Sequence, residues 1–120
     1  MHVVRGKIRF QGHFGPARAV DLVISLVDTT YADAAAVPVA VLHTDLADWE
    51  ITESEGLNFE IQADQLDPLN RYEIMVHLDF NCTGEIKEGD FINMQSYPVL
   101  TQGHPSEVKI KAIQIGSPQY

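Results

Sequence analysis

Apolar and polar side chains alternate from residue 71 to residue 80, with Met75 as the one exception. Successive side chains of a β-strand point to opposite sides, so this pattern predicts a strand with one buried face. The buried face is predicted to hold Tyr72, Ile74, Val76, Leu78 and Phe80, and the other face Arg71, Glu73, Met75, His77 and Asp79. Such a strand is stable only if other elements cover its apolar face, so the pattern constrains the whole fold.

Patterns typical of strands recur along the chain, and no segment has a convincing helical period. The segment 31–38 has helix-forming residues, but it is short and ends in a proline, so we expect one turn at most. Further strands are predicted at residues 4–11, 21–28, 37–44, 57–63 and 107–115. Turn signals at roughly ten-residue spacing then favour an all-β fold. We predict a single-domain antiparallel β-sandwich of about seven to eight strands over residues 1–120.

The first and last of these strands have basic outer faces. Arg5, Lys7 and Arg9 alternate with apolar residues in the first strand, and Lys109 and Lys111 do so in the last. After Lys111 the apolar residues Ile113 and Ile115 appear in the opposite phase, which predicts a β-bulge or a change of sheet.

The net charge of −9 is unevenly distributed. The 52 residues between Arg18 and Arg71 contain eleven acidic residues and no lysine or arginine. A nucleic-acid site would need a basic stripe with interleaved aromatic residues, so we expect no nucleic-acid partner. The acidic half is interpreted either as a solvated surface that aids solubility or as a docking face for a cation or a basic partner.

Membrane and redox signals in the sequence are few. No apolar run approaches the ~18 residues that span a bilayer, so no transmembrane segment is predicted. The N-terminus has no basic region followed by an apolar one, and therefore no visible signal peptide. We expect a cytoplasmic protein if Met1 is the native start, or a periplasmic or outer-membrane-attached one if a leader was removed. The single cysteine, Cys82, excludes an intrachain disulfide and is predicted to be a buried or half-buried thiol.

The segment DFNCTGEIKEGD, residues 79–90, resembles a twelve-residue calcium loop of the EF-hand type. Oxygen ligands at positions 1, 3, 5, 7 and 12 of such a loop, with glycine at position 6, surround a hard cation. Gly84 stands at position 6. The predicted ligands are Asp79, Asn81, Thr83, the carbonyl of Glu85 and Asp90. With two carboxylates the predicted calcium affinity is weak, on the order of 10⁻⁴–10⁻³ M. The alternative is a polar hairpin loop that binds nothing.

Other polar residues suggest sites less specifically. His77 and Asp79 share one strand face, as do His43 and Asp45, so a metal site between two strands is an alternative to ordinary exposed positions. The acidic segment 45–55 contains Trp49, which is either a ligand platform or a plug for the end of the sandwich. No serine or cysteine lies in a motif that would activate it as a nucleophile, so we expect no enzyme activity.

Several segments resemble the type III secretion lipoprotein chaperone family (YscW, including the YbaY-like lipoproteins). The resemblance covers nearly the whole chain, and its most specific part is the segment YPVLTQG, residues 97–103. The other segments are Val4-x-Gly6-x-Ile8, Gly15-Pro16-Ala17, Asp28-Thr29-Thr30-Tyr31-Ala32-Asp33, residues 57–61, and Asp67-Pro68-Leu69-Asn70-Arg71-Tyr72. Residues 1–120 depart from the family pattern in showing neither a leader nor a lipobox cysteine, as expected if a leader was removed or if Met1 is the native start.

The resemblance implies a small β-sandwich that is exported and attached to the outer membrane by a lipid. Some members of the family act as pilotins, which bind a secretin subunit. The resemblance therefore implies a protein partner, secretin-like or another envelope protein. Within YPVLTQG, Pro98 has no N–H to donate to a neighbouring strand, so residues 96–100 are predicted to form a short edge strand. Gly103 is predicted to form the turn into the last strand.

These observations lead to two main hypotheses. The first is a non-enzymatic β-sandwich that resembles the secretion lipoprotein chaperones and holds another polypeptide. The second is a calcium- or carbohydrate-binding module that uses the loop at residues 79–90. A hydrolase is a third reading, with only scattered histidine and aspartate residues in its favour.

Overall fold

The computed structural model describes residues 2–11, 20–31, 34–45, 56–80, 82 and 84–116. These residues form eight β-strands and no helix, and none of them belongs to a helix that could cross a membrane. The prediction of an all-β fold is confirmed. The strands are β1 (His2–Gln11), β2 (Val20–Asp28), β3 (Val37–Asp45), β4 (Leu57–Ala63), β5 (Tyr72–Phe80), β6 (Phe91–Asn93), β7 (Pro98–Val99) and β8 (Glu107–Gln114).

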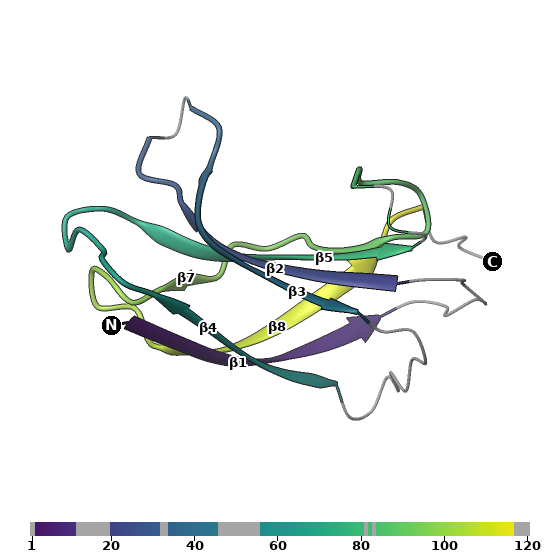
Figure 1. Ribbon diagram of the computed structural model, residues 1–120, viewed down its shortest axis with the longest axis horizontal. Helices are drawn as coiled ribbons and strands as arrows, with labels where there is room; N and C mark the ends of the chain where they lie inside the picture. The colour runs from purple at the N-terminus through teal and green to yellow at the C-terminus, as the bar shows by residue number, and fades with distance from the viewer. Residues whose placement is uncertain are drawn as a thin grey trace.

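The described strands form one mixed sheet in the order β3-β2-β5-β6-β8-β1-β4, with β7 paired to β5 beside this path (Figure 1). Pairing is antiparallel throughout these strands except between β1 and β8, which run parallel. The sheet curves until its two end strands, β3 and β4, come close, which makes it nearly closed and barrel-like.

The predicted antiparallel β-sandwich is therefore corrected in two respects. The strands do not divide clearly into two sheets, and one pair is parallel. The physical reason is that period-two alternation fixes which side of a strand faces the core but not which strand lies beside it. A curved single sheet and a two-sheet sandwich place the same residues inside.

The concave side of the sheet encloses one apolar core. Strand β5 shows its construction, because Tyr72, Ile74, Val76 and Leu78 are all buried, as the alternation predicts. Phe91 of β6 packs edge-on against Phe10 of β1, with ring centroids 5.8 Å apart. The other members of the core cluster are Val4, Ile8, Leu22, Ile24, Leu26, Phe59, Ile61, Ala63, Val99, Ile110 and Ala112.

The last strand does not have the predicted β-bulge. Its register with β1 runs without a shift from Glu107 to Ile113, and its register with β6 is also continuous. The inward positions are Ile110 and Ala112, both buried, while Ile113 is half-buried on the other side. The predicted change of phase was wrong because Ala112 is small and does not stand out as a core residue in the sequence.

The segment YPVLTQG folds as its proline and glycine predict. Strand β7 contains only Pro98 and Val99, pairs with the start of β5 and lies beside the main path of the sheet. Gly103 has a φ of +83°, a left-handed conformation that glycine adopts without strain. The predictions of a short strand at Pro98 and a turn at Gly103 are confirmed, although the strand covers only Pro98–Val99 and not the whole of residues 96–100.

Three of the segments that carry the family resemblance meet at one corner of the sheet. The Asp28 carboxylate accepts hydrogen bonds from the backbone N–H and hydroxyl of Thr30, and from Asn70 Nδ2 at 2.9 Å. Thr30 Oγ1 in turn accepts from the N–H of Arg71 at 3.0 Å, and the Thr101 hydroxyl donates to the Asn70 carbonyl at 2.6 Å. The hydrogen bond from the Thr30 hydroxyl lowers the pKa of Asp28 most, and the bond from the Thr30 N–H lowers it further. These motif residues therefore stabilise the fold.

The faces of β5 give a direct test of this core. Ile74 is fully buried, while its neighbour Met75 is 46% exposed on the opposite face. Ile74→Ala should lower the free energy of unfolding by roughly 2–5 kcal/mol, because it removes a packed side chain and leaves a cavity. Met75→Ala should lower it by less than ~1 kcal/mol. Urea unfolding measures both values, and equal losses would contradict the assigned faces.

Candidate functional site

The end of β5 and the segment that follows it bring the two predicted carboxylate ligands together. Asp79 is the penultimate residue of β5, and Asp90 directly precedes β6. Each is 2% exposed, and together with His77 they offer three donor atoms that all lie within 4.8 Å of one another. Of the other predicted ligands, Asn81 and Thr83 lie outside the described residues. Glu85 is described and exposed.

Asp90 is held by several donors. Its Oδ1 accepts a hydrogen bond from the N–H of Phe80 at 3.0 Å, and its Oδ2 accepts one from the N–H of Lys87 at 3.1 Å. The same Oδ2 lies 2.8 Å from His77 Nε2. The backbone carbonyl of Asp90 accepts from the N–H of Ile115, at 2.8 Å. Asp90 therefore ties the loop to β5 and to the residues that follow β8.

Asp79 shapes the first half of the loop. Its Oδ2 accepts a hydrogen bond from the N–H of Gly84 at 2.8 Å, and Gly84 has a φ of +78°. Gly84 thus forms the turn that its position in the sequence predicts. Asp79 lies on the polar face of β5, yet it is buried. The polar face of the strand was expected to be exposed there, and the burial means that Asp79 also contributes to the stability of the fold.

Chemically, this cluster can act in two ways. Two carboxylates that receive backbone N–H groups stabilise a turn without any ion. The same oxygens are hard ligands of the kind that calcium takes, whereas the imidazole of His77 is a ligand for zinc rather than calcium. Sequence reasoning placed His77 and Asp79 on one face but did not connect His77 with Asp90. That contact depends on how the loop folds back, which strand alternation does not specify.

The two histidines of the alternative metal site between two strands do not lie on neighbouring strands. His43 and His77 are both register partners of Val23, on opposite sides of β2. The Cα atoms of the two histidines are therefore about 10 Å apart, which is twice the spacing between neighbouring strands. His43 Nδ1 instead lies 2.9 Å from Asp21 Oδ2. The side chain of Asp45 lies outside the described residues.

Two further sequence expectations have different outcomes. The segment 46–55, with Trp49, lies outside the described residues, so its predicted role stays a prediction. Cys82 was predicted to be buried or half-buried, and this was wrong, because the residue is exposed. It has a φ of 52°, within the loop that the sequence places directly after β5. Cys82 lies in a turn beyond the end of β5, where its side chain does not face the core and its thiol is therefore not buried.

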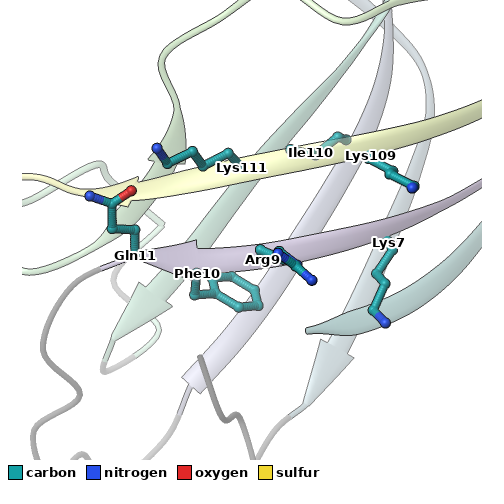
Figure 2. Close-up of a pocket in the computed structure, with 7 residues that line it drawn as sticks. All are labelled: Lys7, Arg9, Phe10, Gln11, Lys109, Ile110 and Lys111. Carbon is teal, nitrogen blue, oxygen red and sulfur yellow. The ribbon is translucent and has the colours of Figure 1, made fainter. Parts of the chain in front are cut away.

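The parallel pairing of β1 with β8 creates a second candidate site. Lys7 is the register partner of Lys109, and Arg9 is the register partner of Lys111. Their side chains surround a hollow of about 700 Å³ (Figure 2). The sequence showed a basic outer face on each strand separately. It did not show that strands from opposite ends of the chain are neighbours, so this combined surface was missed.

The fold is similar to a solved structure, described as an alternative pilotin from the type II secretion system of Vibrio cholerae. The TM-score is 0.75, the sequence identity is 18%, and the match covers 95% of this chain and 96% of that one. No protein-family model and no curated protein matches the sequence. At this identity the likeness is one of fold: the chain has the fold of a secretion pilotin over nearly its whole length.

Proposed function

We propose that this protein is a non-enzymatic, pilotin-like protein that holds another polypeptide, with a secretin-like or other envelope protein as its partner. The observation that carries the proposal is the similarity of fold to the Vibrio cholerae pilotin, which extends over both chains almost completely. The resemblance to the type III secretion lipoprotein chaperones points to the same class of activity.

The shared motifs do not themselves identify the binding surface. Asp28, Thr30, Asn70 and Thr101 are engaged with one another at the corner of the sheet. Their hydrogen bonds give these residues a structural role at the corner of the sheet. Recognition of a partner is therefore assigned to surfaces outside these motifs, which differ from one protein of this fold to another.

Binding of a secretin subunit tests this function. The tagged protein would be cross-linked in its own cells, and each captured polypeptide would then be purified and mixed with the isolated protein. We expect a secretin subunit or another envelope protein to form a stoichiometric complex with the isolated protein, and light scattering measures the mass of that complex. An envelope protein of similar size and charge, chosen at random, serves as the control. Failure of every captured polypeptide to rebind would contradict the proposal.

Binding of a divalent cation by the segment 79–90 is a second candidate function, favoured by the approach of Asp79 and Asp90. Two buried carboxylates repel each other, and a cation between them would remove that repulsion. Calcium is the proposed ion, with the backbone carbonyl of Glu85 as a further ligand. The hydrogen bonds that Asp79 and Asp90 already accept would have to yield in part, so the affinity is expected to be weak.

Calcium at ~10 mM should therefore raise the melting temperature, and magnesium should raise it less, because magnesium holds its waters more firmly. Asp79→Asn keeps the size of the buried side chain and should abolish the calcium-dependent increment, even if it lowers stability in EDTA. Glu88→Gln, an exposed position in the same segment, is the matched control and should keep the increment. No shift in the wild type, or an equal shift in Asp79→Asn, would rule out the site.

A further inference from the structure

The outer surface of the β1–β8 pair concentrates positive charge in a protein whose net charge is −9. Lys7 and Arg9 are two positions apart on β1, so they point to the same side, as do Lys109 and Lys111 on β8. The register places these two pairs directly beside each other. From strand geometry, the Cα atoms of these four residues lie within an area of about 7 Å by 5 Å. We call these four residues the basic array.

The basic array is not neutralised within the described part of the chain. None of its four members takes part in an ion pair among those residues. The neighbouring Arg5 differs, because its Nε lies 3.1 Å from Glu60 Oε2. The hydrogen bond and charge of Arg5 lower the pKa of Glu60. Arg5 also has Glu107 as its register partner on β8, so acidic residues balance this end of the strand pair.

The surface at the basic array is hollowed along the strands. The hollow of about 700 Å³ is lined by the four basic residues with Phe10, Gln11 and Ile110 (Figure 2). A second hollow of about 410 Å³ also includes Lys7 and Lys109 and continues toward Arg5 and Glu107. Because the two share residues, the depression follows the direction of β1 and β8. An elongated depression suits an extended ligand better than a compact ion.

We propose that the basic array binds an extended acidic segment of a partner polypeptide, with carboxylates at alternate positions. Alternate side chains of an extended chain are about 7 Å apart, which matches the spacing within each basic pair. Arg9 can bind a carboxylate through two parallel hydrogen bonds, and the lysines add charge. This inference rests on the proposed function and adds to it the binding surface and the chemistry of the partner.

The acidity of the rest of the molecule favours a short segment over a larger polyanion. A membrane surface or a nucleic acid extends far beyond the basic array and would meet the repulsion of the remaining acidic surface. A peptide segment interacts mainly with charges within about 8–10 Å, the screening length at physiological salt. Within that distance of a segment bound at the hollow, the four charges of the basic array are the main contribution to the electrostatic interaction.

The test uses a fluorescent peptide with glutamate at every second position and serine between, and measures its anisotropy with the full chain. We expect binding that weakens between about 0.01 M and 0.15 M ionic strength. Lys109→Gln with Lys111→Gln should weaken binding by about tenfold or more, or ~1.4 kcal/mol. Arg71→Gln with Lys87→Gln removes the same charge from exposed positions elsewhere and should change the affinity less than twofold.

Two further measurements separate the outcomes. The fourfold reversal Lys7→Glu, Arg9→Glu, Lys109→Glu and Lys111→Glu should bind a peptide with lysine in place of glutamate, which a loss of folding could not produce. Anionic vesicles and inorganic phosphate should compete weakly with the acidic peptide. The inference would be overturned if Lys109→Gln with Lys111→Gln and Arg71→Gln with Lys87→Gln lost the same affinity for the acidic peptide. It would also be overturned if anionic vesicles competed strongly with that peptide. If a secretin subunit binds the Lys109→Gln, Lys111→Gln variant as well as the wild type, the surface is wrong while the proposed function stands.

Discussion

The parallel pairing of the first strand with the last is the constraint on which the rest of the structure depends. Strands β1 and β8 come from opposite ends of the chain, so forming this pair requires closure of a very long loop. Burial of Ile8 and Phe10 on one strand, and of Ile110 and Ala112 on the other, offsets that cost. The pair also joins β4 to the remainder of the sheet, so that β3 and β4 can approach and enclose the core.

The sequence predicts the faces of the strands far better than their neighbours. Alternation identified four buried residues of β5, Tyr72, Ile74, Val76 and Leu78, because each side chain reports its own side of the sheet. It did not predict the burial of Asp79 or that Phe80 is only half-buried. It could not distinguish a nearly closed sheet from a sandwich, because the same residues are buried in both. Parallel pairing of β1 with β8 leaves no local signal at all, since no short turn connects the two strands.

The candidate site shows the same division. Loop spacing predicted that Asp79 and Asp90 would meet, because both positions are fixed by one short segment. The contact of His77 with Asp90 was missed, because it joins a strand residue to the far end of the loop. The basic array was also missed, because its halves lie about a hundred residues apart in the sequence. Features within one segment could be predicted, and features between distant strands could not.

Strands β1 and β8 are parallel neighbours, and nuclear Overhauser contacts between backbone protons test this pairing most directly. We expect contacts between residues 7 and 109, and then between residues 9 and 111, so that the numbers rise together along both strands. These contacts should persist in the Lys109→Gln, Lys111→Gln variant, because the pairing depends on the backbone and the buried face. Contacts whose numbers run in opposite directions, or no contacts between the two strands, would contradict the parallel pairing of β1 with β8.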